Sequence, residues 1–413
     1  MGVIGFGGPS AHLALFRQRF VRDLGWISEQ TFLDLLGVAS LLPGPTSTEV
    51  ALAIGQARAG FRGLLAAGLG FVGPAAIAVL LLAIGYERFG AVPGVAWLLY
   101  GIQPVVVAIV ALAIVGLAPV ALRGPVTWLI GGAAVAALLL GVDPLAVIIG
   151  CGIAAVLWQA ARRIGRGGIA GVAGLMGVGL GALHLGTRHS LAALPSLGAR
   201  PGLGSVAPAV GSVAPGFGGR PGLGSVVPAV ASVAVAGISL PSLFLIFLKI
   251  GLLSFGSGYV LVAFLHADLV QGLGLLTDHQ LLDAVAVGQV TPGPVYTAAT
   301  FIGYLAAGIP GAVVATIAIF LPGFVGVALV HPFVPRLRAS ATTAALLDGV
   351  NAASLGLMAA VTLQLARSTI VDPVTLGLAA VSFLVLLRRP RTAVLLMIGG
   401  GLVGLAVHAA NLV

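Results

Sequence analysis

Two Pro-Gly-Pro sequences interrupt apolar stretches of the chain, at Pro43-Gly44-Pro45 and at Pro292-Gly293-Pro294. Proline lacks a backbone N–H and disfavours helical geometry in the residue before it, so a continuous helix cannot run through either sequence. A new helix with Pro45 or Pro294 in its first turn would present free N–H groups and about half a positive charge at its N-terminus. These are the features of an anion site. Kinks that only shape the packing are the alternative interpretation.

Hydroxyl side chains and glycines accompany both breaks. The hydroxyls are Thr46, Ser47 and Thr48 after the first break, and Thr291, Tyr296, Thr297 and Thr300 around the second. Neutral hydroxyls can donate hydrogen bonds to an oxyanion, but Ser and Thr are also natural helix caps, and the sequence does not decide between these roles. The glycine-rich pieces are Gly7-Gly8 and Gly256-Ser257-Gly258. They favour either close approach of the backbone to a ligand or close packing of helices.

Two ionisable side chains lie within apolar sequence near these elements. Glu49 follows the first break, and a carboxylate at membrane depth is a candidate for proton coupling. Lys249 lies within the apolar run 243–253, where it would either meet an anion or extend its long side chain to the membrane surface. The chain has one cysteine, no His and Cys cluster with metal-ligand spacing, and no glycine loop for a nucleotide. We therefore expect no metal site, no cofactor and no enzymatic chemistry.

The composition indicates which elements position these residues. Of the 413 residues, 59% are hydrophobic and 8% are charged, which excludes a water-soluble globule. Long apolar segments at 64–86, 94–119, 126–141 and 143–160, and again at 312–333, 342–366, 373–387 and 392–410, are typical of membrane helices. We predict an all-α polytopic membrane protein in a lipid bilayer. The formal charge of +9 comes from Arg clusters between apolar runs and does not indicate a nucleic-acid partner.

The chain is built from two similar halves. Glu29, Asp34 and the first Pro-Gly-Pro recur 249 positions later as Asp278, Asp283 and the second Pro-Gly-Pro. One residue is then lost, after which Gly55, Gly60, Gly63 and Pro74 match Gly303, Gly308, Gly311 and Pro322. We assign residues 1–185 to the first repeat, 186–239 to a linker rich in Pro, Gly and Ala, and 240–413 to the second repeat.

The positions of the arginines predict how the two halves are oriented. The loop that holds Arg17, Arg19 and Arg22 is basic, whereas its counterpart, 266–280, contains two Asp and no Lys or Arg. Basic loops stay in the cytoplasm, so these equivalent loops would lie on opposite sides of the membrane. The sequence therefore predicts an inverted-topology repeat with broken or re-entrant helices at the two Pro-Gly-Pro sequences.

Several motifs resemble a known family. They are Phe6-Gly7-Gly8-Pro9 with Ala11-His12, Trp26, Leu42-Pro43-Gly44-Pro45, Lys249-Ile-Gly-Leu-Leu-Ser-Phe-Gly, Gly288-Gln289-Val-Thr-Pro-Gly-Pro and Phe301-Ile-Gly-Tyr. The sequence resembles the chromate ion transporter family in its two-domain form, over nearly the whole chain except the linker. The resemblance implies a multi-pass carrier in a bacterial or archaeal inner membrane, which exports chromate with coupling to the proton gradient and confers chromate resistance. It also places Gln289 among the expected substrate-binding residues.

We expect a tetrahedral divalent oxyanion to bind between the two helix N-termini of an alternating-access carrier. Sulfate has the same charge and nearly the same shape as chromate, so a sulfate carrier is an alternative, and a passive anion channel is another. The sequence leaves open the direction of transport, the stoichiometry, a homodimer, and whether 168–185 spans the membrane. The second half carries apolar residues 240–253 before its glycine motif, whereas the first half begins almost at the motif, so an upstream native start is a further alternative.

Overall fold

The computed structural model describes residues 2, 5, 8–39, 42–90, 92–164, 238–254, 259–330, 341–389 and 392–410. The first half contains α1 (Gly8–Phe16), the π-helix η1 (Arg17–Asp23), α2 (Glu29–Ala39), α3 (Thr46–Phe89), α4 (Pro93–Ala121), α5 (Pro125–Leu139) and α6 (Pro144–Ile164). The second half contains α8 (Leu240–Leu253), α9 (Val260–Leu265), the π-helix η2 (His266–Gly272), α10 (Asp278–Val290), the short 3-10 helix η3 (Val295–Thr297), α11 (Ala298–Val330), α13 (Ala341–Thr369), α14 (Pro373–Arg388) and α15 (Ala393–Ala409). All regular elements in these ranges are helices, which confirms the predicted class.

The helices have the length and composition of membrane helices. Within the described ranges, five are long and apolar enough to cross a bilayer: α3, α4, α6, α11 together with η3, and α13. Shorter apolar helices, α5, α8, α14 and α15 among them, pack beside these five. Large apolar side chains such as Leu69, Ile77 and Leu81 are exposed on α3, as expected where the surface meets lipid instead of water. The chain is a multi-pass membrane protein.

The two halves repeat each other element by element. The π-helices η1 and η2 begin 249 positions apart, at Arg17 and His266. Each half also has one long helix that folds back on itself, at Gly60 in α3 and at Gly308 in α11, with φ of +58° and +62°. Glycine adopts a positive φ without steric cost, so it permits the reversal. The predicted two-half architecture is confirmed, while the inverted orientation and the domain boundaries stay predictions. The residues 168–185 and most of the linker 186–239 lie outside the described ranges.

The reversals turn α3 and α11 into helical hairpins with two legs each. In α3 the legs are 46–58 and 61–89, and a Cβ on Gly55 of the first leg would lie 2.3 Å from the Gly63 carbonyl of the second. In α11 the legs are 298–306 and 309–330, and Gly303 meets Gly311 in the same way, at 2.4 Å. Because no side chain separates the legs, each first leg lies directly against the second leg of its own hairpin.

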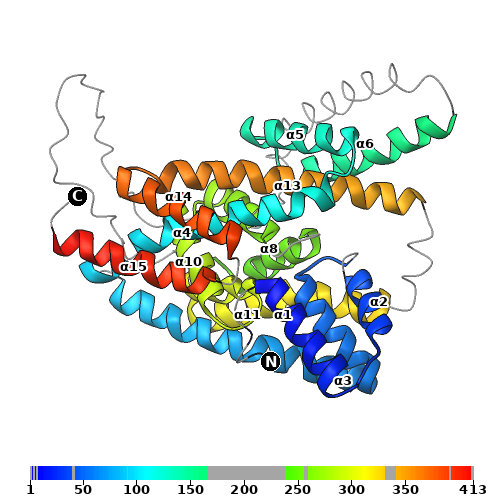
Figure 1. Ribbon diagram of the computed structural model, residues 1–413, viewed down its shortest axis with the longest axis horizontal. Coiled ribbons are helices and arrows are strands. Elements are labelled where there is room, and N and C mark those ends of the chain that lie inside the picture. The colour runs from blue at the N-terminus through cyan, green and yellow to red at the C-terminus, as the bar shows by residue number, and fades with distance from the viewer. Residues whose placement is uncertain are drawn as a thin grey trace, which may run out of the picture.

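The two halves interlock and are not separate lobes. Helix α4 of the first half packs against α14 and α15 of the second, and α13 of the second half packs against α5 and α6 of the first (Figure 1). Small residues bring these helices together: a Cβ on Gly101 of α4 would lie 1.9 Å from the Gly400 carbonyl of α15. Gly349 of α13 meets the Cys151 carbonyl of α6 at the matched place. A movement of one half must therefore displace helices of the other half.

The elements that follow the linker occupy the middle of the molecule. In Figure 1, α8, α10 and α11 lie between α3 on one side and α13 with α5 on the other. The π-helix η2 contains the buried residues His266 and Leu269, whereas its counterpart η1 in the first half has no buried residue. The two halves therefore place similar sequences in different surroundings.

Candidate functional site

Both Pro-Gly-Pro sequences break the helices that contain them. Helix α2 ends at Ala39 and α3 begins at Thr46, while α10 ends at Val290 and η3 begins at Val295. The central glycines, Gly44 and Gly293, have φ of +131° and +121°. Other residues rarely adopt such angles, so glycine is required at the centre of each break. The predicted interruptions are confirmed.

Each break is tied to the opposite half by a backbone hydrogen bond. The Gly44 N–H donates to the Ser254 carbonyl over 2.8 Å, and the Gly293 N–H donates to the Gly5 carbonyl over 2.9 Å. Gly5 and Ser254 are themselves 249 positions apart, so the two bonds are equivalent. The glycine motif at the start of one half thus holds the break of the other half in place.

The packing around the breaks is crossed in the same way. A Cβ on Gly44 would lie 3.9 Å from Cα of Gly323 on α11, and one on Gly293 would lie 2.5 Å from Cβ of Ala75 on α3. Gly323 and Ala75 are matched positions on the second legs of the two hairpins. Since α3 and α11 pack against each other, both breaks lie on the contact between the two hairpins.

The structure corrects the expected position of the prolines that end the breaks. Pro45 and Pro294 were expected in the first turn of the new helices but are N-cap residues, with ψ of 109° and 138°. Each proline carbonyl is the first hydrogen-bond acceptor of its helix. The Thr48 N–H donates to the Pro45 carbonyl, and the Thr297 N–H donates to the Pro294 carbonyl. A proline side chain cannot cap. The N–H groups of Thr46 and Ser47 therefore have no partner within the described ranges.

Four buried side chains at the first break have polar atoms without a hydrogen-bond partner among the described residues. They are Ser47 Oγ, Thr48 Oγ1, both carboxylate oxygens of Glu49, and Tyr296 Oη from the second half. Glu49 Oε1 would lie 2.7 Å from a Cβ on Gly44, so the carboxylate lies against the break itself. The Tyr296 hydroxyl lies beside the Ser254 side chain and within electrostatic range of Glu49. Buried polar groups are normally hydrogen-bonded, so this set of donors and one carboxyl group is available to a ligand.

Two threonine hydroxyls at the second break are already used within the protein. Thr291 Oγ1 donates to the Val287 carbonyl over 2.9 Å, and Thr297 Oγ1 donates to the Pro294 carbonyl over 2.8 Å. A hydroxyl has one hydrogen, so these two cannot also donate to an anion. Gln289 is buried, and its side chain lies beside the Tyr259 hydroxyl. The breaks therefore differ, because hydroxyls without a partner lie at the first break.

Sequence reasoning assigned no role to His12, which lies at the second break. His12 Nε2 is 2.9 Å from the Gly5 carbonyl, the same oxygen that accepts from Gly293. The ring is buried, contacts Phe71 edge-on at 5.2 Å, and its Nδ1 has no partner within the described ranges. The available signal was a single histidine four residues after the first glycine pair. A lone histidine in apolar sequence does not separate a core residue from a site residue.

The structure gives Lys249 a different partner from the one expected. Its Nζ lies 2.6 Å from Asp268 Oδ1 of η2, and the lysine side chain is 41% exposed. An ammonium that is paired with a carboxylate adds no net charge to a nearby anion site. A role for Lys249 in substrate binding stays a prediction, and the structure shows its ammonium paired with Asp268. The sequence pattern could not show this pair, because Asp268 comes from the next helix but one.

The glycine motifs are described only in part. Gly8 is the first residue of α1, and Gly7, Gly256, Ser257 and Gly258 lie outside the described ranges. Their neighbours Gly5 and Ser254 carry the two carbonyls that bind the breaks. Pro43 and Pro292, which open the two breaks, are half-buried.

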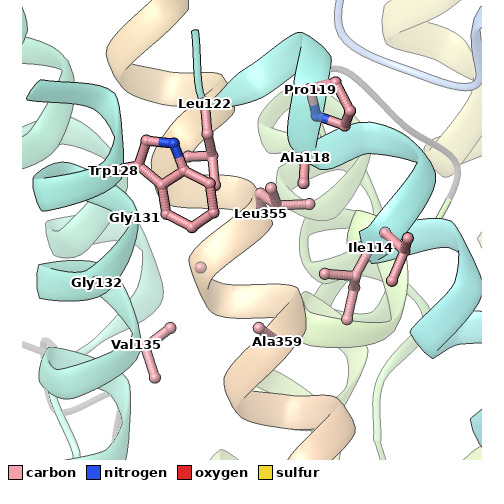
Figure 2. A pocket seen from close by; sticks show the side chains of 12 residues that line it. Ile114, Ala118, Pro119, Leu122, Trp128, Gly131, Gly132, Val135, Leu355 and Ala359 are labelled. Carbon is pink, nitrogen blue, oxygen red and sulfur yellow. The ribbon is translucent and has the colours of Figure 1, made fainter. Parts of the chain in front are cut away.

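One apolar cavity lies away from the breaks. It has a volume of about 500 Å³ and lies between α4, α5 and α13 (Figure 2). The side chains around it include Ile114, Leu122, Trp128 and Leu355. None of the described residues that line it carries a charge or a hydroxyl. Transfer of a dianion into such surroundings would be strongly unfavourable, so this cavity is not an anion site.

Comparison with known proteins identifies relatives over most of the chain. The family described as Chromate transporter matches residues 1–156 and 241–405. The chromate transport protein of Pseudomonas aeruginosa is 31% identical over 415 residues, covering 98% of this chain and 89% of that protein. The chromate transport protein of Cupriavidus metallidurans is 29% identical over 413 residues, covering 99% and 91%. An uncharacterized transporter of Methanocaldococcus jannaschii is 24% identical over 391 residues, covering 94% and 88%. No solved structure matches this chain.

Proposed function

Since the chain belongs to the chromate transporter family, we propose that it is a secondary carrier that exports chromate across the inner membrane by alternating access, coupled to the proton gradient. Two relatives that cover nearly the whole chain are named chromate transport proteins, which supports chromate as the cargo. A membrane potential that is negative inside favours the exit of an anion, by about 2.3 kcal/mol per charge for each 100 mV. The carrier forms no covalent bond with its cargo and needs no cofactor.

One observation carries this proposal: the crossed pair of helix breaks on the contact between α3 and α11. At the first break, the N–H groups of Thr46 and Ser47 are free within the described ranges, and the Ser47, Thr48 and Tyr296 hydroxyls lack partners. Chromate offers four oxygens, all of them hydrogen-bond acceptors. We place the anion here, with the N-termini of α3 and of η3 with α11 directed at it.

The charge of the cargo assigns a role to Glu49. Two helix N-termini supply about one positive charge together, which is less than a dianion requires. Lys249 adds nothing because Asp268 neutralises it. The Glu49 carboxyl is buried against Gly44, so a dianion and an ionised Glu49 would repel each other in a medium of low dielectric constant. We therefore propose that Glu49 is protonated when chromate is bound, which links proton occupancy to anion occupancy.

Alternating access follows from the crossed bonds if the repeats are inverted. The glycine motif of each half holds the break of the other. When one half moves relative to the other, the hydrogen bonds from Gly44 and Gly293 must therefore break and re-form, or the bonded segments must move together. The orientation can be tested with single cysteines at Phe20 and Gly272 in a Cys151→Ala background. Inverted repeats predict that an impermeant maleimide added to cells labels position 272 and not position 20. Equal labelling of both would contradict the inverted arrangement.

Flux through the purified protein in liposomes tests the function. We expect chromate to move faster than sulfate at equal concentration, and the direction of the pH gradient to change the rate. Pro45→Ala with Pro294→Ala should abolish this flux because the breaks could then close into helix. Pro119→Ala is the matched control, since Pro119 lies within α4 away from the breaks.

Each alternative has a distinct outcome in the same assay. A higher rate for sulfate would identify a sulfate carrier. Collapse of an imposed anion gradient without any response to pH would identify a passive channel. Unchanged chromate flux in the double proline variant would remove the breaks from the mechanism.

A further inference from the structure

A second buried carboxyl group, Asp283 of α10, lies in a hydrogen-bonded network that joins three helices. Its Oδ2 accepts from the hydroxyl of Tyr86 on α3 over 2.9 Å, and its Oδ1 accepts from Nε2 of Gln103 on α4 over 2.9 Å. Gln103 Oε1 in turn accepts from His279 Nδ1 over 2.8 Å. The carboxylate is 3% exposed. Asp283 therefore binds α10, the helix that leads to the second break, to both α3 and α4.

Within the part of the chain that the structure describes, the surroundings of Asp283 contain no compensating charge. Its two contacts, Tyr86 and Gln103, are neutral donors, and His279 reaches it only through Gln103. The other titratable or charged groups on the elements packed against α10 make no hydrogen bond or ion pair with it: Glu49, Arg58, Arg62, Glu87, Arg88, Tyr100, Tyr259, His266, Asp268, Asp278, Tyr296, Tyr304, Asp348, Arg367 and His408. An unpaired carboxylate is costly at this depth, so binding of a proton relieves an unfavourable state.

The equivalent residue in the first half does not share this environment. Asp34, on α2, is exposed, and its Oδ1 contacts only Gln30 Nε2, at 3.3 Å, within the described ranges. The two aspartates occupy the same position of the repeat, 249 residues apart. The fold of the repeat therefore does not require a buried carboxyl group here. The buried carboxyl group of Asp283 is a feature of the second half alone.

We propose that Asp283 is a proton-binding site of the transport cycle, separate from Glu49 at the first break. This inference rests on the proposed proton-coupled function. The ionised carboxylate accepts two hydrogen bonds and holds α10 against α3 and α4. A proton taken up from water occupies one of the carboxylate oxygens, which removes an acceptor from Tyr86 or Gln103 and loosens α10. Release of the proton to water restores both bonds.

The position of Asp283 on α10 links this step to the anion site. Asp283 and Val290, the last residue of α10, are separated by about 10 Å of helix at 1.5 Å per residue. The second break follows at once and is tied to Gly5 of the first half. Loosening one end of a rigid helix moves the other end, so a proton on Asp283 changes the position of the second break.

The beginning of α10 provides access for the proton. Asp278, its first residue, is about one-third exposed and pairs with His266 over 3.0 Å. His279 follows directly, is half-buried, and contacts Gln103, which contacts Asp283. Titratable groups therefore extend from the surface to within one side chain of Asp283. The predicted orientation places this end of α10 on the outer side of the membrane.

Asp283→Asn tests the proposal in liposomes, with Asp34→Asn as the matched control. The Asn side chain keeps the size of Asp but has one acceptor oxygen in place of two, so it resembles the protonated acid and does not titrate in this range. Two rates are measured for each variant: chromate exchange at equal pH on both sides, and net chromate flux driven by a pH gradient. We expect Asp283→Asn to keep exchange within about threefold of the wild type and to lower driven flux about tenfold or more. Asp34→Asn should change neither rate.

The outcomes separate this inference from the proposed function. If the wild type shows no response to the pH gradient, the proposed coupling itself is wrong. If the wild type responds and Asp283→Asn responds equally, Asp283 is not a proton site. Equal loss of exchange and driven flux in Asp283→Asn also overturns the inference, because the carboxyl group would then serve the structure alone. Retained exchange with lost driven flux, restored in part by Asp283→Glu, supports it.

Discussion

The break at Gly293 offers the sharpest test of the crossed arrangement. Alanine at this position would keep a φ of +121°, which L-residues rarely adopt. Its Cβ would lie 2.5 Å from Cβ of Ala75, whereas ordinary contacts are 3.4–4 Å. Both atoms are fixed directly to backbone, so neither can rotate away. The break and the second leg of α3 must move apart by about 1 Å.

The cost of Gly293→Ala has two parts. Backbone strain at such an angle is about 1–3 kcal/mol. A shift of about 1 Å also stretches the bond from Gly293 N to Gly5 O, now 2.9 Å, beyond hydrogen-bonding distance, which adds about 1 kcal/mol. The total of about 2–4 kcal/mol corresponds to about a 30- to 1,000-fold loss of the competent arrangement.

Gly274→Ala is the control for the strain alone. Gly274 has φ +60°, and a Cβ there would have no atom within 4 Å. We expect a cost of about 1 kcal/mol and chromate exchange within about tenfold of the wild type. Exchange in liposomes and the thermal midpoint in detergent are measured for both variants.

A second substitution identifies the contact that matters. Ala75→Gly removes the atom that Gly293→Ala would meet, so the double variant should recover exchange by about tenfold while the backbone strain remains. If Gly293→Ala behaves like Gly274→Ala, or if Ala75→Gly recovers nothing, the crossed contact does not position the break and the reasoning fails.

Two further substitutions test the charges. Glu49→Gln resembles the protonated acid, so its affinity for chromate should change little with pH. The affinity of the wild type should rise as the pH falls, because the added proton removes a repulsive charge. Titration of both purified proteins with chromate at several pH values measures this, and pH-independent binding by the wild type would contradict the role of Glu49. Lys249→Met leaves Asp268 unpaired. Because the lysine is partly exposed, this variant should lose only about 1 kcal/mol of stability and should keep chromate exchange. Lys249→Met with Asp268→Asn should recover the thermal midpoint, and a loss of exchange in both variants would return Lys249 to the anion site.

Several features of the site follow from local rules and could be predicted. Proline cannot continue a helix, so both breaks were predictable from Pro43-Gly44-Pro45 and its repeat. The sequence also indicated Glu49, because a carboxylate is uncommon in apolar sequence. It could not separate the hydroxyls that cap helices from those that stay free. The difference between Thr297, which donates to Pro294, and Ser47, which lacks a partner within the described ranges, depends on rotamers and neighbours that no spacing records.

The amino-acid sequence alone established a helical membrane protein of two related halves, with a break at the same place in each. Those properties depend on composition, on repetition along the chain and on the missing N–H of proline, none of which requires knowledge of which distant segments pack together. The partners across the halves were decided by the tertiary structure: Gly44 with Ser254, Gly293 with Gly5, and Lys249 with Asp268. Asp34 and Asp283 have the same place in the repeat, yet one is exposed and the other buried, because burial depends on which distant helices pack against a position.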